Sequence, residues 1–182
     1  KYSVKKKIDE VVFIKHKLFN DFRGNFQELY KYNEFNFLNN NFKIKKVNLS
    51  KSKKNVFRGL HLQTKPKLSK IMRVVRGSAI LFSLDCRASN IKNKIIQYKT
   101  DENDNTLVYA PYYCARGFLS LENNTIVEYF CNAEYNPKYE YSVNFFDSKL
   151  KNKYKNKKKY IISKKDLDSI SINNFKQNKI VS

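Results

Sequence analysis

The sequence is poor in the residues that build metal centres and cross-links. It contains two histidines, three cysteines, one methionine and no tryptophan. Two histidines exclude a three-histidine metal centre, and a site of two histidines plus a carboxylate would need both in one place. Cys86, Cys114 and Cys131 lie in apolar runs without metal-ligand spacing. We therefore expect no metal and no other cofactor, with the cysteines as buried free thiols in a reducing compartment.

Long hydrophobic runs are also lacking. No apolar stretch approaches the roughly 20 residues of a membrane-spanning helix, and no signal-type apolar core follows the segment Lys1 to Lys7. We therefore expect a cytoplasmic protein without a membrane partner.

Acidic residues are scarce: 16 Asp and Glu stand against 37 Lys and Arg, which gives a net charge of +21. Such a charge favours an anionic partner. The basic residues are mostly lysines spread along the whole chain together with many Asn and Ile, a pattern typical of an AT-rich genome. We therefore do not expect nucleic acid as a partner, although a positive field would favour capture of an anionic substrate.

The 4 glycines and 3 prolines fall between short runs of β-branched and aromatic residues. Such runs, with turns about every 8 to 12 residues, predict an all-β sandwich or barrel. The expected strands are Val11 to Ile14, Phe26 to Tyr32, Phe42 to Leu49, Val56 to Leu62, Ile71 to Val75, Ala79 to Leu84, Ile95 to Lys99, Thr106 to Tyr109, Gly117 to Leu121, Thr125 to Phe130 and Tyr141 to Phe146. Arg76-Gly77-Ser78 predicts a tight hairpin between the fifth and sixth of these strands.

The length predicts a single domain, residues 1–182, with a core over about 10–167 and a basic C-terminal segment over 149–182. Within that segment, Lys149 to Lys159 is interpreted as a solvated loop, and Asp166 to Ile172 as a short helix.

The two histidines differ in their surroundings. His16 stands among lysines and is predicted to be solvated, whereas His61 lies in an apolar strand close to Arg58. The period of two in a strand places Arg58 and His61 on opposite faces unless the strand bulges at Gly59.

Several ordered motifs carry a family resemblance. They are Asp21 to Glu28, Val56 to Gln63, Lys70 to Gly77, Asp85 to Arg87, Pro111 to Phe118, Asn144 to Asp147 and Ile162 to Asp166. Together they resemble the dTDP-4-dehydrorhamnose 3,5-epimerase family over roughly residues 10–167. The resemblance implies a cupin-type jelly-roll β-barrel with short peripheral helices, a homodimer, and no metal or cofactor. The implied substrate is a nucleoside diphosphate 4-keto-6-deoxy sugar, inverted at C3, C5 or both, in deoxysugar biosynthesis for lipopolysaccharide or another surface polysaccharide.

The resemblance also assigns roles. His61 matches the general base, Asp147 the carboxylate that orients it, and Tyr129 the tyrosine that returns a proton to the opposite face. These residue types suit the chemistry, because a C4 ketone lets the carbanion at C3 or C5 delocalise as an enolate whose oxygen needs a cation or a hydrogen-bond donor. The expected substrate contacts are Arg23, Phe26 and Glu28 for the nucleotide, Asn48 and Ser50 for the sugar, and Arg58 and Lys70 for the keto sugar and its phosphates. Gln63 and Arg116 are also expected to contact the substrate, and Arg116 could bind a phosphate or an enolate oxygen or mark a different sugar.

The sequence departs from the family pattern at three positions. Arg116 stands where a second histidine is usual, Leu62 where a tyrosine is common, and Lys46 where a glutamine is frequent. An arginine replaces a titratable imidazole with a permanent, forked cation. Two alternatives therefore stay open: a 3,4-ketoisomerase acting on a related nucleotide sugar, and a non-catalytic basic β-barrel that binds nucleic acid or glycan.

Overall fold

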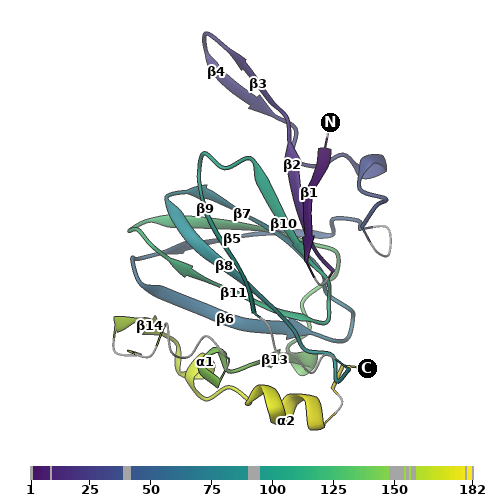
Figure 1. Ribbon diagram of the computed structural model, residues 1–182, viewed down its shortest axis with the longest axis vertical. Coiled ribbons are helices and arrows are strands. Elements are labelled where there is room, and N and C mark those ends of the chain that lie inside the picture. Colours follow the sequence, from purple (N-terminus) through teal and green to yellow (C-terminus); the bar gives the residue numbers. More distant parts are fainter. Residues whose placement is uncertain are drawn as a thin grey trace.

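Two antiparallel sheets pack face to face in the computed structural model, which describes residues 2–8, 10–38, 42–89, 95–147, 154, 156, 159–178 and 180–181 (Figure 1). The side chain of Asp147 is not among those described. The strands are β1 (Tyr2–Ile8), β2 (Val11–His16), β3 (Leu18–Asp21), β4 (Gly24–Gln27), β5 (Lys46–Ser52), β6 (Val56–Gln63), β7 (Lys70–Arg76), β8 (Ser78–Asp85), β9 (Ile95–Asp101), β10 (Thr106–Ala110), β11 (Cys114–Ser120), β12 (Thr125–Cys131), β13 (Glu140–Ser142) and β14 (Ile161–Ile162).

The first sheet has the order β1-β2-β10-β7-β12-β5, and the second has the order β13-β6-β11-β8-β9 with β14 added to β6. The core lies between them and is built largely of the aromatic and β-branched residues that predicted the strands. β10 and β11 are buried along their whole length. The predicted all-β jelly roll is therefore confirmed.

The predicted hairpin at Gly77 is wrong, although its two strands exist. β7 pairs with β10 and β12 of the first sheet, whereas β8 pairs with β9 and β11 of the second. Only Gly77 separates the two strands, and a single residue is too short for a hairpin loop. Gly77 has φ +72°, and the chain crosses there from one sheet to the other.

β3 and β4 form a separate hairpin that projects beyond the sandwich (Figure 1). Its phenylalanines contact little of the rest of the chain: Phe22 is 98% exposed and Phe26 is 67% exposed. His16 lies at its base, 2% exposed, with Nε2 2.9 Å from Oε1 of Gln27. The prediction of a solvated His16 was therefore wrong, because its side chain is buried and bonded to Gln27.

The segment after β12 forms short 3-10 turns and one short strand instead of the predicted strand Tyr141 to Phe146. β13 ends at Ser142, and 3-10 turns occupy η2 (Pro137–Tyr139) and η3 (Phe145–Asp147), as η1 (Tyr32–Glu34) does earlier. The predicted helix Asp166 to Ile172 is instead two helices, α1 (Lys164–Leu167) and α2 (Ile172–Gln177). Most of Lys149 to Lys159 lies outside the described residues. Among the described helices, none has the length and apolarity to cross a membrane.

Candidate active site

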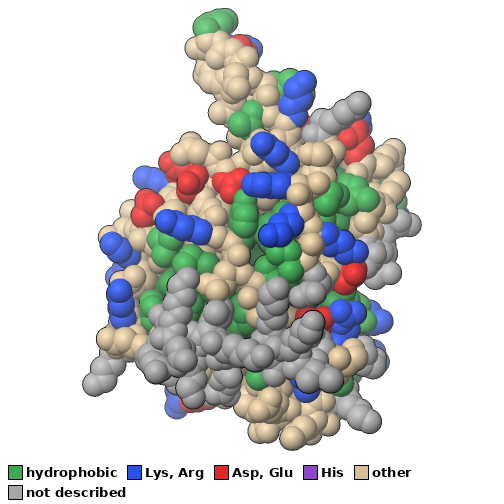
Figure 2. Space-filling model, in the orientation of Figure 1, with side chains coloured by type: hydrophobic (Ala, Val, Ile, Leu, Met, Phe, Trp, Pro, Cys, Tyr) green, Lys and Arg blue, Asp and Glu red, His purple; other side chains and the backbone are tan. Residues whose placement is uncertain are grey.

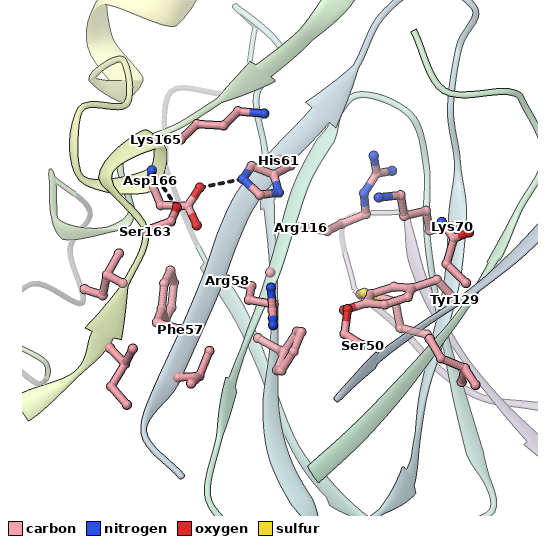
Figure 3. Close-up of a pocket in the computed structure, with 18 of the residues that line it drawn as sticks. Ser50, Phe57, Arg58, His61, Lys70, Arg116, Tyr129, Ser163, Lys165 and Asp166 are labelled. Carbon is pink, nitrogen blue, oxygen red and sulfur yellow. Dashed lines mark hydrogen bonds and ion pairs between the residues drawn. The ribbon is translucent and has the colours of Figure 1, made fainter. Parts of the chain in front are cut away.

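A cavity of about 900 Å³ opens between the two sheets. Its walls come from β5, β7 and β12 of the first sheet and β6 and β11 of the second, and the β14–α1 segment closes one side. The polar lining residues are Asn48, Ser50, Arg58, His61, Lys70, Arg116, Tyr129, Ser163, Lys165 and Asp166. Figure 3 labels these side chains, apart from that of Asn48, and shows that they come from both sheets and from the β14–α1 segment.

Two close approaches of backbone shape the β6 wall. A Cβ on Gly59 would lie 2.6 Å from the carbonyl oxygen of Arg116, and one on Gly117 would lie 2.4 Å from that of Arg58. Gly59 has φ +106°, which favours glycine, and the pairing of β6 with β11 shifts register here. The predicted irregularity at Gly59 is therefore confirmed, and it allows Arg58 and His61 to line one cavity.

His61 is held by a carboxylate from the far end of the chain. Its Nε2 lies 2.6 Å from Oδ1 of Asp166, which is 105 residues away. An imidazole whose Nε2–H donates to a carboxylate presents an unprotonated Nδ1. Figure 3 shows this second nitrogen turned away from Asp166, toward the side of the cavity that holds Arg116 and Lys70. The arrangement is that of an oriented general base.

Local structure fixes Asp166 in place. Ser163 caps α1 by accepting a hydrogen bond from the Asp166 backbone N–H, and Oδ2 of Asp166 accepts one from the Gly59 N–H at 3.2 Å. Burial alone would raise the pKa of Asp166, but the hydrogen bonds from His61, Gly59 and Ser163 together with the charge of His61 outweigh burial and lower it. The carboxylate therefore stays ionised and stabilises an imidazolium.

Tyr129 faces the cavity from the opposite sheet. Its hydroxyl is 3.2 Å from Oγ of Ser50 on the neighbouring strand β5. Burial raises the pKa of Tyr129 to about 12, against smaller lowering effects of the Ser50 hydrogen bond and of Arg58. The hydroxyl is therefore protonated near neutral pH and can donate a proton.

Two cationic side chains, Lys70 on β7 and Arg116 on β11, lie together on the cavity wall away from Asp166 (Figure 3). The Lys70 ammonium lies 5.7 Å from the centre of the Tyr129 ring. Burial, followed by the charge of Arg116, lowers the pKa of Lys70 to about 8. A buried cation at this place can stabilise a developing oxyanion.

The chain was compared with known protein families and structures. Residues 5–174 match the family model described as dTDP-4-dehydrorhamnose 3,5-epimerase. The chain belongs to the dTDP-4-dehydrorhamnose 3,5-epimerase family. The family resemblance of the sequence motifs is thus confirmed.

Individual relatives agree with the family assignment. The chain is 30% identical over 147 residues to a dTDP-4-dehydrorhamnose 3,5-epimerase of Methanothermobacter thermautotrophicus, which covers 79% of this chain and 78% of the relative. It is also 30% identical over 133 residues to a dTDP-4-dehydro-6-deoxyglucose 3-epimerase of a Streptomyces species, covering 71% and 68%. A crystal structure of the dTDP-4-dehydrorhamnose 3,5-epimerase of Sulfolobus tokodaii superposes with a TM-score of 0.84 at 31% identity, covering 94% of this chain and 96% of that one.

The family resemblance assigned Asp147 as the carboxylate that orients His61, whereas among the described residues the carboxylate that contacts His61 is that of Asp166. The Asp147 side chain lies outside the described residues, and its backbone ends the η3 turn. Asp166 belongs to the motif Ile162 to Asp166, which carried part of the family resemblance but was given no catalytic role. The parallel pairing of β14 with β6 brings that motif to His61.

Some of the predicted substrate contacts line the cavity and the others do not. Asn48, Ser50, Arg58, Lys70 and Arg116 line the cavity.

Gln63 does not line the cavity, so its prediction as a substrate contact was wrong. It is 1% exposed, donates to the carbonyls of Pro66 and Glu134, and accepts from the Asn136 N–H. A buried amide with these three bonds joins two loops.

Arg23, Phe26 and Glu28 also lie apart from the cavity lining in the single chain. Arg23 and Phe26 belong to the projecting hairpin, and Glu28 follows it. Arg23 is paired with Asp21 at 2.6 Å. These residues can reach a substrate only in another copy of the chain or after the hairpin moves.

Proposed function

We propose that this protein epimerises a dTDP-linked 4-keto-6-deoxy sugar at C3, C5 or both. The observation that carries the proposal is the His61–Asp166 pair in a cavity whose opposite wall holds Tyr129. A 3,5-epimerase and a 3-epimerase among the relatives at 30% identity support the substrate class, and they leave the regiochemistry open.

The proton is removed by His61. Nδ1 takes a proton from the carbon beside the C4 ketone, and the electron pair of the broken C–H bond forms the enolate. Asp166, held ionised, stabilises the resulting imidazolium. The enolate oxygen meets the cations Lys70 and Arg58, which line the same cavity.

Inversion needs a proton from the other face of the sugar ring. Tyr129 lies on the sheet opposite His61 and keeps its proton at neutral pH. Donation from Tyr129 to the enolate carbon leaves a tyrosinate, which recovers a proton through solvent as His61 loses its own. A sugar held between the two sheets is therefore deprotonated on one face and reprotonated on the other.

The active form in this proposal is a homodimer. The hairpin β3–β4 carries exposed phenylalanines beyond the sandwich, and the edge strand β5 leaves Val47 and Leu49 exposed beside the cavity. An exposed apolar edge and an exposed apolar hairpin suit each other in a two-fold contact. Such a contact would bring Arg23 and Phe26 of one copy toward the substrate of the other.

We place the enzyme in the cytoplasm, where it supplies an activated deoxysugar for a surface polysaccharide. Its three cysteines are free and buried, as suits a reducing compartment. We propose a small-molecule anion rather than nucleic acid as the partner, and on the face shown in Figure 2 the described Lys and Arg side chains are scattered rather than gathered in one stripe.

Solvent exchange tests the proposal. The protein is incubated in deuterated water with dTDP-4-keto-6-deoxyglucose and, in parallel, with the GDP- and UDP-linked analogues, and C3 and C5 are followed by NMR. We expect deuterium with the dTDP sugar, and incorporation at one carbon defines a mono-epimerase. Absence of deuterium from both carbons of the dTDP sugar would reject the assignment, and movement of the ketone to C3 would indicate a ketoisomerase.

A further inference from the structure

Arg116 occupies an unusual place for a charged side chain. It pairs in register with His61 across β6 and β11, is 3% exposed, and lies between the two sheets. Its Nη1 donates to the carbonyl oxygens of Leu68 at 2.8 Å, Pro111 at 3.1 Å and Ala110 at 3.4 Å. Backbone groups thus fix the guanidinium.

The remaining donors of Arg116 are unused. Nε and Nη2 are buried and have no hydrogen-bond partner among the described residues. The part of the chain that the structure describes offers Arg116 carbonyls and no carboxylate. An uncompensated buried charge is costly, so its retention indicates a use other than stability.

Lys70 is the cavity residue whose pKa is affected by the charge of Arg116. The two side chains come from different sheets and meet beside the cavity (Figure 3). Burial is the largest cause of the lowered pKa of Lys70, and Arg116 is the next. The other charged or titratable groups around Lys70 are Cys131 on β12, Glu140 on β13, Lys46 on β5 and the Tyr129 ring.

We propose that Arg116 is a positioning residue that acts through Lys70, making its ammonium a proton donor to the C4 oxygen of the substrate rather than a static charge. This inference rests on the proposed epimerase function. Because Nε and Nη2 of Arg116 are themselves buried, the guanidinium acts on the substrate by way of Lys70. An arginine suits this role because it remains charged throughout the working pH range, unlike a histidine.

The proton balance closes. His61 takes the proton from carbon, the C–H electron pair becomes the C=C bond of the enol, and the carbonyl oxygen takes a proton from Lys70, which becomes a neutral amine. In the second half the enol O–H proton returns to Lys70 while Tyr129 protonates carbon. Lys70 thus ends as an ammonium. His61 is left as an imidazolium and Tyr129 as a tyrosinate, and both return to their starting forms when His61 loses a proton to solvent and Tyr129 takes one from solvent.

The pH dependence of kcat/KM tests the inference, since it reports groups of the free enzyme. The proposal requires the ammonium form of Lys70, so wild-type activity should decline above an alkaline limb near pH 8. Arg116→Met removes the charge at similar length and should move that limb upward by roughly one pH unit, because a nearby like charge no longer disfavours the ammonium. Arg116→Lys keeps a cation, so its alkaline limb should lie between that of Arg116→Met and that of the wild type.

Arg76→Met is the matched control, because Arg76 is an exposed arginine on the same strand as Lys70 and lies outside the cavity lining. It should keep the wild-type profile. A uniform loss of activity in Arg116→Met with an unmoved limb would show a merely structural role and overturn the inference.

Lys70→Arg decides the matter if Arg116→Met does not fold. A guanidinium keeps its proton across this range and cannot donate it to the C4 oxygen, so the rate should fall and the limb near pH 8 should disappear. A wild-type rate, or persistence of the limb, would overturn the inference. Failure of the inference about Arg116 can be distinguished from failure of the proposed function. An active wild type with an unmoved limb removes only the role of Arg116, whereas a wild type that exchanges no deuterium removes the proposed function as well.

Discussion

At the scale of single residues, the account depends first on Asp166. Asp166→Asn keeps the shape but removes the charge that stabilises the His61 imidazolium, so kcat should fall by about 10²- to 10⁴-fold while the fold is retained. Steady-state epimerisation measures the loss. Asp168→Asn is the matched control, since Asp168 is exposed two residues away and should keep the wild-type rate. Equal rates for both variants would separate Asp166 from catalysis.

Tyr129→Phe separates proton removal from inversion. Without the hydroxyl, His61 still removes a proton and can return deuterium to the same face, so label should appear in substrate of unchanged configuration. Epimerised product should fall by about 10²- to 10⁴-fold. NMR of the sugar measures both, with the exposed Tyr135→Phe as the control. Full inversion by Tyr129→Phe would assign the second proton to another group.

The sequence located most of the candidate site, because His61, Lys70 and Tyr129 lie in motifs that match the family and line one cavity. It did not locate the partner of His61. That contact joins residues 105 positions apart through the parallel β14–β6 pairing, and no local pattern reports a long-range pairing. His16 was wrongly predicted to be solvated, since neither its burial nor its contact with Gln27 is visible in its lysine-rich neighbourhood.

At the scale of elements, Gly59 holds β6 against β11. Gly59→Ala would place a Cβ 2.6 Å from a backbone carbonyl at a positive φ, and should reduce the free energy of unfolding by about 2 to 4 kcal/mol. Gly24→Ala is the control, because Gly24 also has a positive φ but nothing within 4 Å of a Cβ. It should cost about 1 to 2 kcal/mol, from backbone strain alone. Urea denaturation compares them, and equal losses would show that the close approach is unimportant.

Strand positions were predictable where side chains are β-branched or aromatic, as in β2, β6 and β12. β1 was not predicted, since Tyr2–Ile8 is mostly exposed and rich in lysine. The sheet that each strand joins was also not predictable from local pattern. β7 and β8 are adjacent in sequence, yet they lie in different sheets because one residue cannot form the loop of a hairpin.

At the scale of the whole molecule, the projecting hairpin should hold two copies together. Phe22→Ser combined with Phe26→Ser removes exposed aromatic surface, and because these rings pack little within one chain, the subunit should stay folded. Analytical ultracentrifugation should show a dimer for the wild type and a larger monomer fraction for the variant, with a raised KM. A monomeric wild type with full activity would contradict the dimer proposal.

The central claim is that His61 takes a proton from carbon, and deuterium incorporation by single-histidine variants tests it most directly. His16→Asn serves as the matched control, because His16 lies at the base of the hairpin and outside the cavity lining. With folding of both variants verified by circular dichroism, His16→Asn should exchange solvent deuterium into the substrate and His61→Asn should not. Deuterium incorporation by His61→Asn at the wild-type rate would contradict the account.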